Sequence, residues 1–391
     1  MNKLKIGTRG SALALKQAEI TEAALAAAFP ELEVERVIIT TTGDRRTDVA
    51  LSEVAKVEGV WDKGVFIKEL EIALENGEID VAVHSLKDLP TVLEDQFELA
   101  GVLERAPVRD AFIGKVSWEE LGQGSVVGTS SARRAQQLVD LKPGVEVCDL
   151  RGNVPTRLRK AAEGEMDGII LAEAGLRRLG YSVEGSLEIE GHVLSVQCLP
   201  EREFFPAAGQ GAVGYEIRSN DCESRAIIAA LNHDDTWARI TAERRFLELL
   251  SAGCNTPVGV WSEITGDEIK MGARVYPETG GEPQRAEVSA APGEVIGNSK
   301  AGEVVLLEKF PTSFDVTFFV EGFLDIKMVA PTGEFDSIVA HVFDFRQEFS
   351  EREIGPLAGE ESDGSWHGMS WIIELSGGSL GKIFGNQRKS S

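Results

Sequence analysis

The sequence has few of the features that would support a disulfide framework, a metal centre or a membrane anchor. Its 391 residues include only four cysteines and five histidines, and neither a CxxC pair nor an HExxH motif occurs. We therefore expect no disulfide scaffold and no bound metal. No apolar run is long enough to span a bilayer, and the start, MNKLKIGTRGSALAL, lacks the apolar core of a secretory signal. These absences favour a reduced, cytoplasmic environment away from membranes.

Positive charge is also in short supply. Lysine and arginine number 40 against 64 aspartates and glutamates, which gives a formal net charge of −24. Such a balance opposes non-specific binding to nucleic acid. Any local cluster of arginines is informative, because it must be kept against this overall negative field.

Residues 1 to about 230 alternate between strand-like and helix-like segments. We predict strands at 4–6, 34–40, 79–83, near 97–103, 110–114, 125–128, 145–150 and 168–172. The helices predicted between them are 12–29, 65–76, 131–141, 153–164 and 173–179. This order is typical of α/β domains with mostly parallel sheets, whose ligands bind at the carboxyl ends of the strands.

The pattern changes from about residue 234. A helix over 236–251 followed by strands at 258–263 and 268–275 predicts a small α+β domain. The last 93 residues differ again, because they hold 12 of the 26 aromatic residues. We predict strands there at 303–309, 316–329, 336–346 and 369–375. No catalytic motif is recognisable in this part, which we interpret as a separate module.

Basic and hydroxyl side chains follow several of the predicted strands. They form the groups Thr8-Arg9-Gly10-Ser11, Thr129 to Arg134, Arg151 with Arg157, and Arg177-Arg178. Helix starts favour anions, and guanidinium groups match carboxylates. Taken singly, each group can equally be interpreted as a helix cap beside a solvated arginine. Together on one sheet edge they predict a cleft for a small molecule with several carboxylates.

The stretch VHSLKDLP, residues 83–90, also follows a strand. Pro90 favours an extended Leu89, so Asp88 is expected in a turn. A carboxylate among cations can stabilise developing positive charge or carry protons. The alternative is a surface turn in which Lys87 and Asp88 have no role.

Two further stretches are ambiguous when taken alone. Lys63 and the start of VFIKELE follow a glycine-containing segment. This arrangement indicates either a mobile loop at a site or an ordinary amphipathic helix with a flexible lead-in. Cys254 lies in the turn-like loop SAGCNTPVG and is either an attachment point or nucleophile, or a small buried apolar residue.

A set of motifs carries a specific resemblance. They are IGTRGSALALKQA (6–18), KGVFIKELE (63–71), DVAVHSLKDLP (80–90), VGTSSARRAQQL (127–138), LRGNVPTRL (150–158), DGIILAEAGLRRLG (167–180), AAGQGAVG (207–214), LNHDDT (231–236), TAER (241–244) and AGCNTPVG (252–259). With this order and spacing, the sequence resembles the porphobilinogen deaminase (hydroxymethylbilane synthase) family over residues 3 to about 297.

The resemblance implies a fold of two lobes like those of periplasmic binding proteins, with parallel-rich mixed sheets. Domain 1 would comprise residues 1–102 and 211–230, and domain 2 residues 105–205. Domain 3, a small α+β unit at 233–297, would carry Cys254. Residues 298–391 fall outside the resemblance. They would form a strand-rich extension of unknown role, and a part in association is one interpretation.

The implied activity is that of a transferase of tetrapyrrole and haem biosynthesis. Four porphobilinogen molecules would be joined head to tail, with loss of ammonia, into linear hydroxymethylbilane. The chain would grow on a dipyrromethane cofactor held by a thioether to Cys254. A monomer is expected. The alternative is a non-catalytic, two-lobed module that binds carboxylates.

Residue roles also come from the resemblance. Asp88 would be catalytic: it would hydrogen-bond pyrrole N–H groups, stabilise the methylene-pyrrolenine cation and aid proton movement. Ser85 would help to position the cofactor, Phe66 would stack near the incoming pyrrole, and Gln210 would lie where the chain crosses between domains. The groups expected to hold the carboxylates are Arg9, Ser11, Lys63, Lys87, Thr129, Ser131, Arg133, Arg134, Arg151, Arg157 and Arg178.

Overall fold

The computed structural model describes residues 2–41, 67–250, 257–266, 268–277 and 282–290, together with four short strands between residues 316 and 385. The chain divides into two compact units, Met1–Pro292 and Gly293–Ser391. All the predicted site residues belong to the first unit.

The first sheet of this unit has five strands in the order β2-β1-β3-β11-β4. Their bounds are β1 Lys3–Arg9, β2 Glu33–Ile39, β3 Val81–Ser85, β4 Phe97–Val102 and β11 Val213–Arg218. The strand β1 is parallel to β2 and β3. The strand β11 returns from much later in the chain and is antiparallel to β3 and β4.

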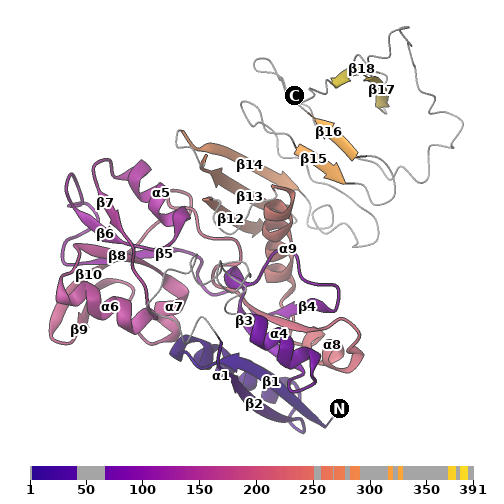
Figure 1. Cartoon of the computed structure of the whole chain (residues 1–391), viewed down its shortest axis with the longest axis horizontal. Coiled ribbons are helices and arrows are strands. Elements are labelled where there is room, and N and C mark those ends of the chain that lie inside the picture. Colours follow the sequence, from indigo (N-terminus) through magenta and orange to yellow (C-terminus); the bar gives the residue numbers. More distant parts are fainter. Residues whose placement is uncertain are drawn as a thin grey trace, which may run out of the picture. The chain divides into compact units, whose positions relative to one another are not determined.

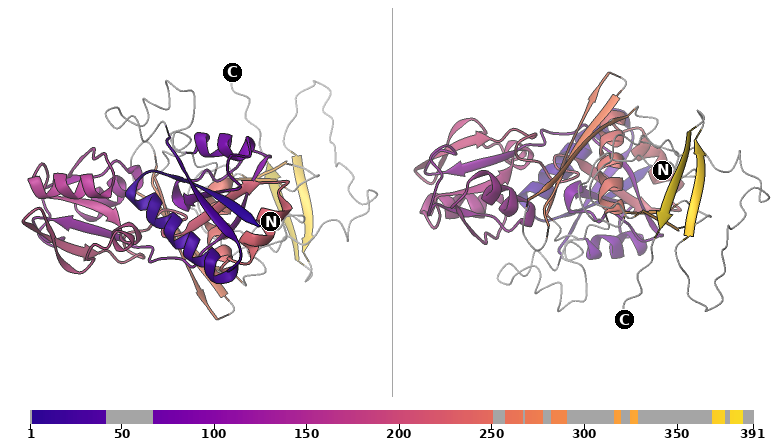
Figure 2. Two further views of the ribbon diagram at one scale, coloured as in Figure 1. Left: turned by 90° about the horizontal axis from the view of Figure 1, so that it is seen from below. Right: turned by 90° about the horizontal axis from the view of Figure 1, so that it is seen from above.

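Helices cover both faces of this sheet, as Figures 1 and 2 show. They are α1 (Ala12–Ala28), α4 (Lys68–Glu75) and α8 (Cys222–Ala229). Side chains alternate between the two faces of a strand. Val81 and Val83 of β3 therefore pack in one core with Leu25 of α1, and Ala82 packs in another with Leu70 of α4.

The second sheet has six strands in the order β7-β6-β8-β5-β10-β9. The bounds are β5 Asp110–Gly114, β6 Val126–Gly128, β7 Glu146–Cys148, β8 Gly168–Ala172, β9 Gly185–Ile189 and β10 His192–Cys198. Three helices accompany it, α5 (Ala132–Leu141), α6 (Val154–Glu163) and α7 (Glu173–Arg178). The strands β7, β6 and β8 are parallel, whereas β5, β9 and β10 pair antiparallel. Both large sheets are thus mixed and rich in parallel pairs, as predicted.

A third, antiparallel sheet has the order β12-β13-β14. It consists of β12 (Val258–Thr265), β13 (Glu268–Val275) and β14 (Gln284–Ala290), and the long helix α9 (Asp234–Leu249) packs on β12. Asp234 and Asp235 lie in the first turn of α9, where carboxylates stabilise the helix dipole. The α+β character predicted from residue 234 onward is confirmed.

Several elements were not predicted. The segment between Tyr181 and Phe205 forms the hairpin β9–β10, which extends the second sheet. The strands β11 and β14 and the helix α8 were also missed. The predicted helix 65–76 is described from Lys68 to Glu75, and residues 65 and 66 lie outside the described part.

In the second unit, the structure describes two antiparallel hairpins. One joins β15 (Val316–Phe319) to β16 (Asp325–Met328), and the other joins β17 (Met369–Leu375) to β18 (Ser379–Gly385). The prediction of one continuous strand over 316–329 was therefore wrong, because the segment folds back on itself. The strand at 369–375 is confirmed. The predicted strands at 303–309 and 336–346 lie outside the described residues.

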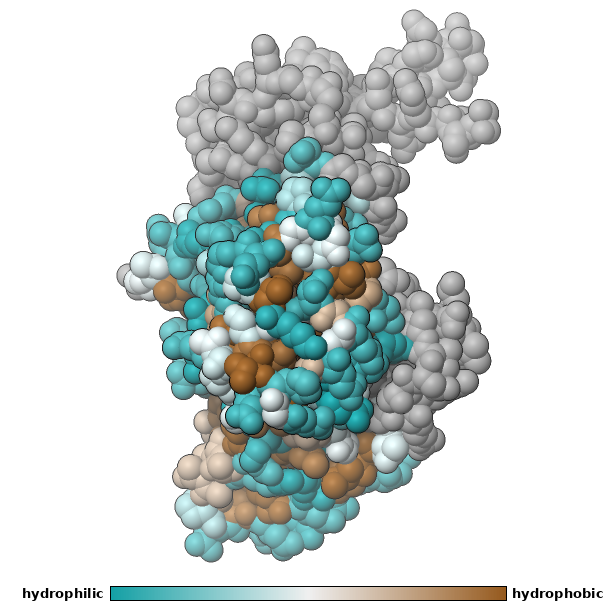
Figure 3. Space-filling view, turned by 90° about the vertical axis from the view of Figure 1, so that its left-hand side faces the viewer, coloured by the Kyte–Doolittle hydropathy of each residue, from teal (hydrophilic) through white to brown (hydrophobic). Residues whose placement is uncertain are grey.

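The described surface of the first unit is mixed in character. Figure 3, which views it from the side of the second sheet, shows apolar side chains scattered among hydrophilic ones. None of the described helices combines the length and the apolar character needed to cross a lipid bilayer.

Candidate active site

The turn that follows β3 presents Asp88. Leu86–Asp88 form a single turn of 3₁₀ helix, and Leu89 is extended at φ −80°, ψ 132°, as expected for the residue before a proline. Leu86 and Leu89 are 1% and 2% exposed and anchor the turn in the core. The two residues between them, Lys87 and Asp88, are only half-buried.

A long side chain from α9 holds the far end of this turn. The Arg244 guanidinium donates to the carbonyl oxygens of Leu89, Pro90 and Thr91, at 3.3, 2.5 and 3.0 Å. Three consecutive carbonyls are thereby fixed by one planar group. The helix that leads toward Cys254 is thus tied to the backbone just after Asp88.

The chain that returns from the second sheet to the first packs against the same turn. Gly209 has a φ of +74°, and a Cβ there would lie 3.0 Å from the backbone nitrogen of Lys87. Gly211 has a φ of +86°, and its Cβ would lie 2.4 Å from the carbonyl oxygen of Ala106. Both positions therefore need glycine. Nη2 of Arg178 donates to the Gly211 carbonyl at 2.7 Å and brings α7 to this segment.

Arg133 and Arg134 are almost buried, at 6% and 5% exposure, and share one buried carboxylate. Asp110 lies 2.8 Å from Nη2 of Arg133 and 2.6 Å from Nη2 of Arg134. Burial opposes ionisation of Asp110, but the two arginines outweigh it and hold its pKa at about 2. Gln210 is fully buried beside them and donates to Asp110 and to the Val108 carbonyl. Carboxylate binding by both arginines stays a prediction.

Other cations also interact with Asp88. Burial, with help from Arg134, lowers the pKa of Lys87 to about 8, and Asp88 acts against this shift. Burial likewise lowers the pKa of Arg157 to about 10, again with Arg134 helping and Asp88 opposing. Nη1 of Arg151 is buried and has no hydrogen-bond partner among the described residues. Such groups favour an anionic ligand, which would offset the cost of burying their charge.

The hydroxyl groups at the strand ends act as helix caps. Ser11 caps α1 and Ser131 caps α5, each accepting a hydrogen bond from the backbone N–H three residues later. Thr129 is buried and accepts from the N–H of Ser131 at 3.2 Å. Arg9 is half-buried at the end of β1. The caps are confirmed, and contact of these residues with a ligand stays a prediction.

Three predicted site residues, Lys63, Phe66 and Cys254, lie outside the described part of the chain.

Two buried acids of the site region were missed in the sequence. Asp110 opens the apolar strand β5. Glu243 on α9 is fully buried and pairs with Arg105 at 2.6 Å, while it also accepts from the N–H of Gly209. Fully buried acids are almost always paired. An acidic residue on an otherwise apolar strand or helix face was therefore the available signal.

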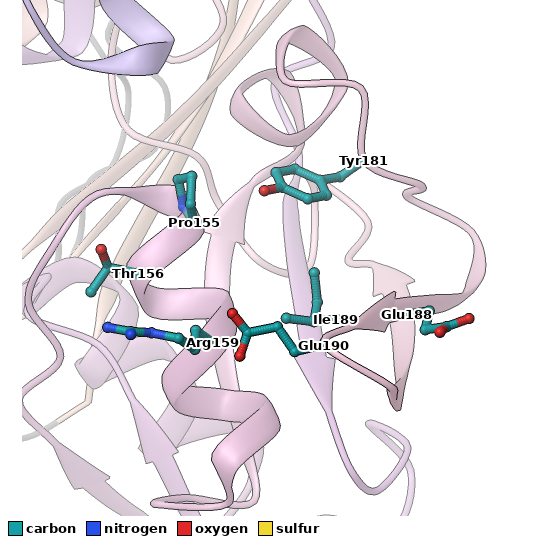
Figure 4. A pocket seen from close by; sticks show the side chains of 7 residues that line it. All are labelled: Pro155, Thr156, Arg159, Tyr181, Glu188, Ile189 and Glu190. Atoms are coloured by element: carbon teal, nitrogen blue, oxygen red, sulfur yellow. The ribbon is translucent and has the colours of Figure 1, made fainter.

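The described residues also line a pocket of about 420 Å³ between α6 and the β9–β10 hairpin. Figure 4 shows the Tyr181 ring pointing across it toward Pro155, with Glu188 directed outward. None of the predicted site residues lines this pocket.

The residues around Asp88 fit a cofactor with several carboxylates. Nη1 of Arg151, which is buried and has no hydrogen-bond partner within the described part of the chain, supplies a donor. Lys87 and Arg157, whose charged forms are disfavoured by burial, supply positive charge. Asp88 supplies one acceptor beside them.

Fold and site together define a two-lobed α/β protein with a cationic site where its lobes meet. Residues 4–226 match the family model of the dipyrromethane cofactor-binding domain of porphobilinogen deaminase. Residues 237–303 match the model of the C-terminal domain of the same enzyme. The chain belongs to the porphobilinogen deaminase family. Family membership favours tetrapyrrole synthesis over the alternative of a non-catalytic carboxylate-binding module.

Two curated relatives carry the name porphobilinogen deaminase. The protein of Syntrophobacter fumaroxidans is 41% identical over 293 residues, 74% of this chain and 90% of the relative. That of Chromobacterium violaceum is 45% identical over 277 residues, 70% of this chain and 84% of the relative. Among solved structures, the periplasmic VFT2 domain of Bordetella pertussis BvgS matches 62% of this chain and 93% of its own, at 13% identity and a TM-score of 0.36.

Proposed function

We propose that this chain is a porphobilinogen deaminase that joins four porphobilinogen molecules, with loss of one ammonia at each addition, and releases the product by hydrolysis as linear hydroxymethylbilane, one water supplying its hydroxyl group. The observation that carries the proposal is the Asp88 turn, which holds a half-buried carboxylate beside Lys87 and Arg157, two cations whose charged forms are disfavoured by burial. Each porphobilinogen brings two carboxylates, so its oligomers are polyanions that match these cations.

Carboxylate binding is assigned to side chains of turns and helices that accompany both large sheets. Lys87 and Arg157 support it best, because burial of their positive charge is costly and an anion would relieve that cost. Arg133 and Arg134 are held in place by Asp110 and add positive potential. The remaining members of the carboxylate-binding set are Arg9, Ser11, Lys63, Thr129, Ser131, Arg151 and Arg178. Ser85 is proposed to position the cofactor, Phe66 to stack near the incoming pyrrole, and Gln210 to lie where the chain crosses between the domains.

The dipyrromethane cofactor is proposed to be attached by a thioether to Cys254. When bound, it supplies the nucleophilic pyrrole carbon to which the first porphobilinogen is joined. Arg244 supports this assignment, since it links α9, the helix before Cys254, to the backbone after Asp88.

Asp88 is proposed to act on the substrate. When the carbon–nitrogen bond breaks and ammonia leaves, positive charge develops on the methylene carbon and the pyrrole nitrogen. A nearby carboxylate stabilises that charge and accepts the pyrrole N–H. After the new carbon–carbon bond forms, the attacked ring carbon must lose a proton, and Asp88 aids its removal.

The test is turnover by purified protein. We expect it to consume porphobilinogen and release one ammonia per molecule consumed. Asp88→Ala should abolish turnover and leave the thermal transition unchanged, whereas Asp95→Ala, at an exposed position, should retain activity. Near-normal turnover by Asp88→Ala would refute its role. Binding of porphobilinogen by the unaltered protein without consumption would favour the non-catalytic module.

Further parts of the proposal concern the whole chain. The three separate sheets support domains at 1–102 with 211–230, 105–205 and 233–297. We also propose a cytoplasmic monomer, with residues 298–391 as an interaction module. Truncation at about residue 298 tests the last point. Unchanged solubility, activity and molecular size would contradict a role of residues 298–391 in interaction.

A further inference from the structure

A chain of buried hydrogen bonds runs from β11 through α1 to the end of β3. The Tyr215 hydroxyl donates to Oγ1 of Thr21 at 3.1 Å, and Oγ1 of Thr21 donates to the backbone carbonyl of Gln17 at 2.9 Å. The side chain of Gln17 then donates from Nε2 to Oγ of Ser85 at 2.7 Å. Tyr215 and Thr21 are fully buried, and Gln17 is 2% exposed.

The donors in this chain follow from the atoms that the structure brings together. Thr21 has a single hydroxyl hydrogen, which goes to the backbone carbonyl of Gln17, so the Tyr215 hydroxyl donates to Thr21. In the structure the side-chain amide of Gln17 turns its Nε2 toward Ser85, and in this orientation Ser85 accepts. A serine hydroxyl that accepts from one side keeps its own hydrogen for another partner. Within the described part of the chain, Ser85 donates to no protein acceptor.

Ser85 lies at the carboxyl end of β3, three residues before Asp88, and is half-buried. Its unused hydrogen is therefore available at the site where a carboxylate is expected. We propose that Gln17 is a positioning residue, which fixes the Ser85 hydroxyl as a donor toward a carboxylate of the bound pyrroles. This inference rests on the proposed function for the identity of the ligand.

A hydroxyl fixed as a donor selects for an acceptor. If Gln17 were apolar, Ser85 would rotate freely and lose much of this preference. A hydrogen bond to a charged acceptor of this kind corresponds to roughly ten- to hundredfold in affinity. A carboxylate at position 17 would have the larger effect, because it would draw the Ser85 hydrogen to itself and repel an anion.

The experiment measures the dissociation constant for porphobilinogen in the Asp88→Ala background by calorimetry, so that binding is read without turnover. Gln17→Leu, Ser85→Ala and the double variant form one cycle. The isosteric Gln17→Glu is a second variant, in case Gln17→Leu does not fold. Gln197→Leu is the matched control, since Gln197 makes an exposed hydrogen bond to Glu119. Thermal transitions are recorded for all variants.

We expect each single variant to weaken binding about tenfold, the double variant to match Ser85→Ala, and Gln17→Glu to bind most weakly. The control should bind normally. Losses that multiply in the double variant, or normal binding by Gln17→Leu and Gln17→Glu, would overturn the inference. Failure of the unaltered protein to consume porphobilinogen would remove the proposed function and leave this binding cycle interpretable.

Discussion

The substitution Asp110→Asn examines the buried charge cluster that supports the site. Asp110 is fully buried, and its two oxygens face Arg133 at 2.8 Å and Arg134 at 2.6 Å. Asparagine keeps the shape but removes the negative charge. Two nearly buried guanidinium groups would then lack a counter-charge, and the amide NH₂ group of the asparagine would face N–H donors of the arginines.

The expected cost follows from this arrangement. Removing one partner of a buried ion pair costs about 3–5 kcal/mol. For the compact unit Met1–Pro292, an unfolding entropy of about 2.1 cal/mol/K per residue makes this a fall of roughly 5–8 °C in the thermal transition. The dependence of stability on acid pH gives a second measure of the Asp110 contribution, because its pKa of about 2 lies below the usual 3.8. The shift represents about 2 kcal/mol, present above pH 4 and lost as the pH falls through about 2.

Chemical and thermal unfolding of the two proteins measure these quantities. We expect Asp110→Asn to unfold at lower temperature and to lose less stability between pH 4 and pH 2 than the unaltered protein. Asp95→Asn, at an exposed position, should change stability by less than about 0.5 kcal/mol. A loss below about 1 kcal/mol in Asp110→Asn would refute the reasoning, since it would mean that water or other groups already compensate the two arginines.

Two further predictions concern the site and the return of the chain between the sheets. Because the pKa of Lys87 is lowered to about 8, its charge is lost as the pH rises through 8, and kcat/KM for porphobilinogen should fall there. Lys87→Arg should move this fall to higher pH, because the guanidinium group stays charged. An unchanged alkaline profile would contradict a role for Lys87 in binding. Gly211→Ala should lower stability more than Gly77→Ala, since both have positive φ but only the former brings a Cβ within 2.4 Å of the Ala106 carbonyl. Gly77→Ala alone should cost about 1–2 kcal/mol, and equal losses in denaturant unfolding would show that the close approach does not matter.

Local patterns in the sequence were sufficient to predict most of the alternating elements. Ser11 before an Ala- and Leu-rich run predicted the start of α1, and Pro90 predicted the extended Leu89. Both signals act within a few residues. The hairpin β9–β10 was missed because its strands carry exposed polar residues at positions such as Glu188 and His192.

Long-range pairing limited the prediction of the site. The rows of basic residues were visible, but their partners lie far away in the chain. Asp110 is separated by more than 20 residues from Arg134, and Glu243 by more than 130 from Arg105. No local pattern states that a given arginine faces a protein carboxylate. The link from Gln17 to Ser85 was hidden for the same reason, because it exists only after α1 packs on the sheet.

The mass of the intact protein is the most direct test of the central claim, that Cys254 holds a pyrrole cofactor at the Asp88 site. Purified from cells that make porphobilinogen, the protein should exceed its sequence mass of 42.3 kDa by one dipyrromethane. Cys254→Ser should lose this increment, and Cys222→Ser, at an exposed free cysteine, should retain it. A well-folded, unmodified protein from such cells would contradict the account.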